Sequence, residues 1–270
     1  MATKTTGAGW DALPVGIEFL KLQQGIEEAC GVTTDELSAS AGRAQPATIE
    51  ALGTVLSMLY RLACCGWGCA GGDHTIEWLI GRVVNHASGA YRLMRAAYYD
   101  ESLVLTRGIG ETANLLCLFK QDATELAAWK AATRRERLSS FGPAAVRKKI
   151  ENRASEGTYI DQVRYQKLCE LGTHPVPGVA PGHYSGTGRP VLSGIIQEAG
   201  VFVDITELSY AVGLTAIWSI ELLALPQDAK KKLFDGSVNL IAALGAFTIL
   251  EYEDLLAKAL REHNAKAEPR

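Results

Sequence analysis

Apolar residues recur every three or four positions along most of the chain, a period that is typical of helices with one buried face. The stretch Ile17–Cys30 follows this pattern, and Gly31 is expected to end it. Strand-like alternation is nearly absent, and no Asn-Gly or Asp-Gly turn lies between apolar runs. The pattern therefore predicts an all-α fold: a single bundle-like domain of about eight helices over residues 15–262, with flexible tails at 1–14 and 263–270.

Capping residues set further expected boundaries. Asp73 is expected to cap a helix that runs to about Tyr98, and Asp100 a second helix that runs to about Lys120. One continuous helix is expected from Asp122 to about Leu138, and another over roughly Ser193–Leu225.

One long segment without helical pattern interrupts this series. Gly172–Pro190 holds five glycines and four prolines in 19 residues, together with two histidines. Loops longer than about 12–15 residues are uncommon in compact domains and are usually functional or disordered. Two interpretations stay open: a surface connection, or a lid or ligand loop.

Composition narrows the class of protein. With 47% hydrophobic residues the chain is expected to fold, and a net charge of −3 argues against a protein that coats nucleic acid throughout. Met1–Gly16 does not resemble a signal peptide. Leu208–Leu225 contains Glu221, and Val238–Leu250 has only 13 residues, so neither is expected to cross a membrane. We expect a cytoplasmic protein, and Val238–Leu250 fits either burial in the monomer or a homodimer.

The cysteines do not form a recognisable metal motif. Cys64, Cys65, Cys69 and His74 have the spacing C-x3-C-x4-H, but structural zinc sites pair CxxC with a second pair further on, and no second pair follows. Glycine-rich nucleotide loops and the serine-hydrolase elbow are also absent from the sequence. No metal and no cofactor are expected.

A charged stripe within an apolar helix is the first candidate site. Arg107, Glu111 and Asn114 are four and three residues apart, so they share one helix face among mostly apolar neighbours. Charges on a buried helix must be paired or line a wet cavity, because an unpaired buried charge is very costly. The stripe therefore predicts either a structural ion pair or a site that Gly108 and Gly110 let a ligand approach.

A second candidate precedes the long loop and consists of Arg164, Tyr165, Glu170 and His174. Glu170 lies four residues before His174, so its carboxylate could orient the imidazole and raise its pKa, as a general acid or base requires. The alternative is a histidine that only stabilises the end of a helix.

Positive charge is concentrated in one block. Residues 130–153 contain eight basic and two acidic residues, a local charge of +6, with Arg134, Arg135 and Arg147 among the basic ones. Such a block suits nucleic acid or another phosphate-bearing ligand, but a solvated surface helix gives the same pattern.

The order of these motifs resembles a known group of proteins. The motifs are R-x3-E-x2-N (Arg107, Glu111, Asn114), F-x-P-x2-V-R (Phe141, Pro143, Val146, Arg147) and Y-x2-L-x-E-x3-H-P (Tyr165, Leu168, Glu170, His174, Pro175). Over about residues 75–225 they resemble uncharacterised bacterial and phage helical proteins that are distantly similar to the HEPN superfamily of ribonucleases, toxins and phage-defence effectors. HEPN active sites have four to six residues between an arginine and a histidine, whereas Arg82 and His86 here have three residues between them and Arg164 and His174 have nine.

Two functions follow as hypotheses. The first is a regulatory or binding protein with a basic contact surface. The second, implied by the resemblance, is a metal-independent ribonuclease with His174 and Glu170 as the acid–base pair. In that case Arg107 or Arg164 would stabilise the developing charge, and Arg134, Arg135 and Arg147 would hold the RNA backbone.

Overall fold

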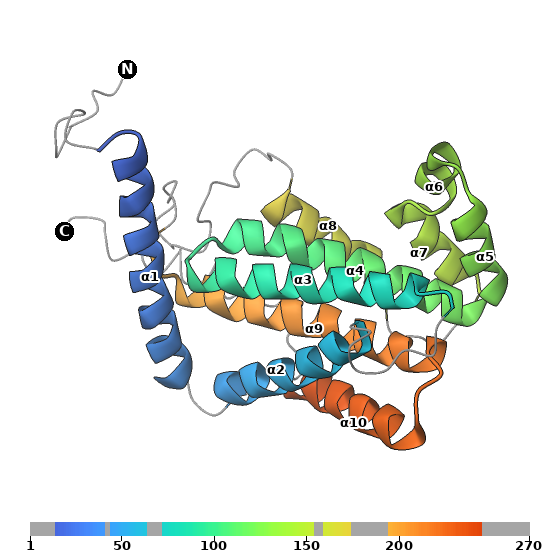
Figure 1. Cartoon of the computed structure of the whole chain (residues 1–270). Helices are drawn as coiled ribbons and strands as arrows, with labels where there is room; N and C mark the ends of the chain where they lie inside the picture. The colour runs from blue at the N-terminus through green and yellow to red at the C-terminus, as the bar shows by residue number, and fades with distance from the viewer. Residues whose placement is uncertain (1–13, 41–43, 64–71, 154–158, 174–193, 245–270) are drawn as a thin grey trace, which may run out of the picture.

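The computed structural model describes residues 14–40, 44–63, 72–153, 159–173 and 194–244, and within these ranges the protein is a single all-α domain without strands (Figure 1). Its helices are α1 (Ile17–Ser40), α2 (Ala44–Ala63), α3 (Thr75–Arg95), α4 (Tyr99–Gln121), α5 (Ala123–Ala131), α6 (Arg134–Ser140), α7 (Pro143–Asn152), α8 (Gln162–Gly172), α9 (Glu198–Leu222) and α10 (Gln227–Ala243). The all-α prediction is confirmed, although the described chain has ten helices rather than about eight.

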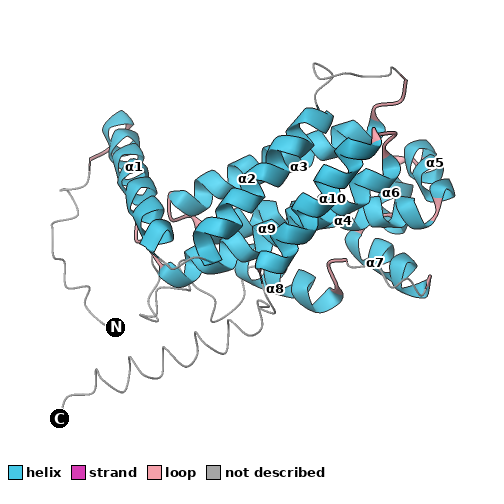
Figure 2. Cartoon of the chain, turned by 90° about the horizontal axis from the view of Figure 1, so that it is seen from below, coloured by secondary structure: helices cyan, strands magenta, loops and turns pink. Residues whose placement is uncertain are grey.

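Helices α4 and α9 form the centre of the domain, and α3 lies beside them (Figure 1). Leu103, Ile109 and Leu116 of α4 are fully buried, as are Val201 and Leu208 of α9. Helices α2 and α10 pack against one side of this layer, α1 lies at one end, and α5, α6 and α7 lie at the other (Figures 1 and 2). This end of the bundle carries the candidate site.

Among the described helices, α9 alone is long and apolar enough to span a membrane, but 83% of its apolar window is buried inside the domain. A buried core helix passes the same test of length and composition. The cytoplasmic location therefore stays a prediction, and so does the homodimer, because part of Val238–Leu250 lies outside the described residues.

The expected helix from Asp122 to Leu138 was wrong, since the chain breaks between α5 and α6. Thr133 has an extended backbone and starts α6 with a capping box: its hydroxyl accepts from the Glu136 N–H (3.3 Å), and the Glu136 carboxylate accepts from the Thr133 N–H (2.7 Å). These bonds satisfy N–H groups that a continuous helix would have bonded internally. The T-x-x-E signature was present in the sequence but was not used.

Helix α1 continues past Gly31 to Ser40, where the sequence predicted an end at Cys30. Gly31 lies inside the helix, and a Cβ there would make an ordinary van der Waals contact with the Arg95 guanidinium, 3.5 Å away. Arg95 also pairs with Asp35 on the following turn (Nε to Oδ1, 2.8 Å), which holds this half of α1 against α3. The contact with a distant helix therefore overrides the local tendency of glycine to end a helix.

The other predicted boundaries shift by a few residues. Asp73 accepts from the Thr75 N–H (3.1 Å) before α3, as a capping side chain does, but Asp100 lies inside the first turn of α4 rather than before it. Helix α9 begins at Glu198 instead of near Ser193.

Several predictions fall outside the described residues: nearly all of both tails, residues 174–190 of the Gly/Pro-rich loop, and Cys64, Cys65 and Cys69. Cys30, Cys117 and Cys169, the cysteines of the described part, are buried free thiols. No cluster of three or more metal-ligating side chains occurs among the described residues.

Candidate functional site

The predicted stripe on α4 lies at the edge of the bundle that faces α7 and α8. Arg107 Nε is 3.4 Å from Glu111 Oε1, and the two side chains are 22% and 32% exposed. The ion pair is therefore formed, but it is only partly buried. Pairing, one of the two compensations that the sequence allows for a charged stripe, therefore occurs here.

Tyr165 of the neighbouring helix α8 is hydrogen-bonded to this ion pair. Its hydroxyl donates to Glu111 Oε1 (2.9 Å), and Arg107 Nη1 donates to Thr173 Oγ1 (3.0 Å). Burial and the adjacent Glu111 charge raise the pKa of Tyr165, so the phenol keeps its proton and remains a donor at neutral pH. Residues from two of the sequence motifs thus meet in one hydrogen-bonded network.

Arg147 of α7 adds a third motif to the network. Its side chain lies over the Tyr165 ring at 4.1 Å, and its Nε and Nη2 donate to Gln162 Oε1 (3.1 and 2.6 Å). The residue is only 4% exposed. No carboxylate of the described residues pairs with it, and its Nη1 is buried without a hydrogen-bond partner. Arg147 is therefore a buried cation without a counter-ion in this part of the protein.

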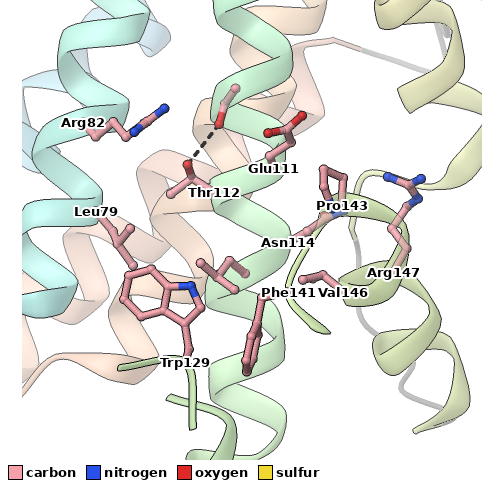
Figure 3. A pocket seen from close by; sticks show the side chains of 12 residues that line it. Leu79, Arg82, Glu111, Thr112, Asn114, Trp129, Phe141, Pro143, Val146 and Arg147 are labelled. Atoms are coloured by element: carbon pink, nitrogen blue, oxygen red, sulfur yellow. Dashed lines mark hydrogen bonds between the residues drawn. The ribbon is translucent and has the colours of Figure 1, made fainter. Parts of the chain in front are cut away.

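A pocket of about 200 Å³ opens beside these groups (Figure 3). Arg82 of α3, Glu111 of α4 and Arg147 of α7 lie along one side of it, and Trp129 of α5 and Phe141 lie along the other. Arg82 is exposed and makes no hydrogen bond or ion pair with the described residues. The pocket therefore has one charged wall and one aromatic wall, built from four helices and the turn before α7.

Asn114 also lines the pocket, and its amide makes two hydrogen bonds with the backbone. Its Nδ2 donates to the Ile160 carbonyl and its Oδ1 accepts from the Ile160 N–H, both at 2.8 Å. A Cβ at Gly110 would lie 3.0 Å from Ile160, so the missing side chain lets this segment approach α4. Asn114 thus holds Ile160, two residues before α8 begins, which positions Gln162 and Tyr165.

Arg82 and His86 of α3 are not among the site residues that the sequence predicts. A Cβ at Gly108 would lie 3.1 Å from His86 Nδ1, so the glycine of α4 makes room for this imidazole of α3. Burial and the neighbouring Arg82 lower the pKa of His86, which is therefore neutral at pH 7. The usable signal was the Arg82–His86 spacing of four, which puts both residues on one face of α3.

Four predicted site residues lie apart from the pocket. Arg164 donates to Glu207 of α9 through Nε and Nη2 (2.6 and 2.9 Å) and stacks on Tyr210, so its charge is already compensated. Glu170 pairs with Lys167 at 3.2 Å. Arg134 and Arg135 lie exposed on α6. His174 lies outside the described residues, so the proposed Glu170–His174 pair stays a prediction.

Several of the positive charges in the basic block are paired with carboxylates. Lys130 pairs with Asp73, Lys149 pairs with Glu125, and Arg153 pairs with both Asp122 and Glu125. The exposed basic residues of the block without an ion pair in the described structure are Arg134, Arg135, Arg137 and Lys148. Within the block, the exposed basic residues without an ion pair in the described part of the chain therefore lie on α6 and on one face of α7.

Comparison with known proteins adds no relative: the chain matches no family model, no curated protein and no solved structure. The chemistry of the pocket is therefore the basis on which its ligand must be inferred.

Proposed function

We propose that the protein binds a phosphate-bearing ligand in this pocket, with Arg147 as the group that holds the phosphate and Arg82 at the opposite end of the charged wall (Figure 3). The observation that carries the proposal is the buried guanidinium of Arg147, which has an unpaired Nη1 and no carboxylate partner among the described residues. Arginine does not lose its proton in proteins, so burial leaves it charged. An anion in the pocket would supply the missing partner.

The contacts of Arg147 within the protein orient it without neutralising it. The Gln162 oxygen is neutral, and the Tyr165 ring offers only the weaker attraction of an aromatic face. Both hold the guanidinium plane in place before a ligand arrives. A pre-oriented arginine loses little further entropy on binding, which favours affinity.

The charge balance of the site favours phosphate over a simple carboxylate. Arg82 and Arg147 line the pocket with the carboxylate of Glu111 between them (Figure 3), and Arg107 pairs with that carboxylate, so these four groups carry a formal charge of +2. A phosphate monoester carries about −1.5 to −2 at neutral pH and offers three acceptor oxygens. A single guanidinium can bind two oxygens of such a group at once.

The exposed arginines and lysine of α6 and α7 give the same end of the molecule a positive potential. Such a potential raises the rate at which an anion reaches the site and is weakened by salt. The basic contact surface of the first hypothesis would then guide the ligand, while the pocket would hold it.

The test measures binding of inorganic phosphate by calorimetry for the wild-type protein and two variants. Arg147→Met keeps an unbranched side chain in the buried space but removes the charge, and it should weaken binding at least tenfold. The control, Arg135→Gln, removes one charge from the surface of α6 and should change affinity less than about twofold, because exposed charges are screened. Equal affinity of the wild type and Arg147→Met for phosphate would refute the proposal.

A ribonuclease remains the second candidate, and one contact favours it. Arg107 is hydrogen-bonded to Thr173, the residue that directly precedes His174 in the chain. Purified wild-type protein should then degrade RNA without added metal, and His174→Ala should not. Equal RNA stability in the two samples would remove this candidate without affecting the binding proposal.

A further inference from the structure

The aromatic wall of the pocket consists of side chains with exposed surface. Trp129 packs on Phe119 at 5.7 Å between ring centroids, with the planes tilted by 57°. Its indole N–H makes no hydrogen bond with the described residues, and Figure 3 shows the indole nitrogen on the side that faces the pocket. Phe141 lies next to it, supported by the Lys149 ammonium 4.2 Å from its ring. This wall suits a planar ring, since aromatic side chains stack on nucleobases with little dependence on sequence.

The carboxylate of Glu111 constrains the ligand further. Oε1 accepts from Tyr165, and Oε2 makes no hydrogen bond with the described residues although the side chain lines the pocket. An ionised carboxylate can only accept hydrogen bonds, and it repels a phosphate placed beside it. A ligand that fills the pocket must therefore carry a hydroxyl or amine donor as well as its anion.

Pocket size limits how much of the ligand is enclosed. About 200 Å³ is less than the roughly 300–1,000 Å³ of pockets that enclose a drug-sized ligand. The pocket thus contacts part of a molecule and leaves the remainder in solvent, as it would with a nucleotide that is free or at the end of a nucleic-acid chain.

We infer that the ligand is a ribonucleotide. Its phosphate would lie against Arg147, its base against Trp129 and Phe141, and a ribose hydroxyl would donate to Glu111. This inference rests on the proposed phosphate-binding function. A ribonucleotide carries an anion, a planar ring and hydroxyl donors in one small molecule. The pocket offers an arginine for the anion, aromatic side chains for the ring and a carboxylate for a hydroxyl. The 2′-hydroxyl is the group that distinguishes RNA from DNA.

A series of probes on the wild-type protein tests each part by calorimetry. AMP should bind about tenfold more tightly than ribose 5-phosphate, which lacks the base, and about tenfold more tightly than dAMP, which lacks the 2′-hydroxyl. Phenyl phosphate, which has a ring but no hydroxyl, should also be weaker than AMP. A 5′-phosphorylated RNA hexamer distinguishes the two sources, because tighter binding of the hexamer assigns the pocket to an RNA end and tighter binding of AMP to a free nucleotide.

Two variants connect these preferences to the structure. Glu111→Gln keeps an oxygen for Tyr165 but presents an amide N–H to the ribose, so the preference for AMP over dAMP should fall to within about twofold. Trp129→Leu should abolish the preference for AMP over ribose 5-phosphate. Its matched control is Trp78→Leu, a residue 72% exposed on α3 that does not line this pocket.

The outcomes separate the two proposals. If ribose 5-phosphate or dAMP binds the wild type as well as AMP does, the ribonucleotide assignment is wrong while phosphate binding stands. If neither inorganic phosphate nor any of the phosphate esters binds, the proposed function itself fails. Unchanged preferences in Glu111→Gln and Trp129→Leu, with thermal unfolding that shows both variants folded, would place the nucleotide elsewhere on the protein.

Discussion

Asp204 of α9 gives the sharpest test of the packing at the centre of the domain. The residue is fully buried at the interface with α4, and neither of its oxygens has a hydrogen bond of normal geometry to the described residues. Burial raises its pKa well above the ordinary 3.8; the nearby Ser102 hydroxyl lowers it, and the negative charges of Asp100, Glu101 and Glu207 raise it further. The folded protein therefore holds a proton that the unfolded chain releases.

This proton sets the sign and size of the change in the free energy of unfolding with pH. Because the folded state binds one more proton, the free energy of unfolding falls as pH rises from about 3.9, the pKa of an unfolded aspartate, up to the folded pKa. The slope for one proton is about 1.4 kcal/mol per pH unit. Asp204→Asn removes the titration but keeps the shape, so it should be increasingly more stable than the wild type across this interval.

Urea unfolding of both proteins between pH 4 and pH 8 measures the difference directly. Glu221→Gln is the control, since Glu221 lies near the end of the same helix and its hydrogen bond to Lys120 lowers its pKa. That bond stabilises the fold at neutral pH and is lost only as pH falls below about 4.5, the pKa of an unfolded glutamate, so above about pH 5 the stability difference between this variant and the wild type should stay constant. A stability difference between Asp204→Asn and wild type that stays constant with pH would show that Asp204 is not a buried protonated acid.

Three further substitutions test the contacts around the site, each by urea unfolding or amide exchange. Arg164→Met leaves Glu207, which is 1% exposed, without its counter-ion and should cost about 3–5 kcal/mol, whereas a cost below 1 kcal/mol would mean that the pair is hydrated. Asn114→Ala leaves both backbone groups of Ile160 unbonded and should cost about 2–3 kcal/mol; no loss would contradict the two bonds. Thr133→Ala removes the cap of α6 and should cost about 1 kcal/mol, seen as faster amide exchange in α6 alone, and unchanged exchange there would argue against the capping box.

The sequence predicted the features that depend on the spacing of residues along a helix. Helical periodicity gave the all-α class, and the intervals between Arg107, Glu111 and Asn114 gave their common face. Tyr165 was also placed among the candidate site residues, and in the structure its hydroxyl donates to Glu111, another of them. What spacing could not provide was the partner of each side chain: Asn114 binds a backbone segment 46 residues away, and Arg164 binds Glu207.

Arg147 shows why the rest of the site could not be predicted from the sequence. In sequence it is one of eight basic residues and has the same apparent status as its neighbour Lys148. In the structure Lys148 is exposed and Arg147 is 4% exposed beneath Tyr165, because α7 packs on α4 and α8 with one face only. A local count of charge treats the two residues alike, but water surrounds the charge of Lys148, whereas Arg147 is buried without a counter-ion among the described residues. The residue that best indicates a ligand is therefore the one that a local count of charge assigns to the surface.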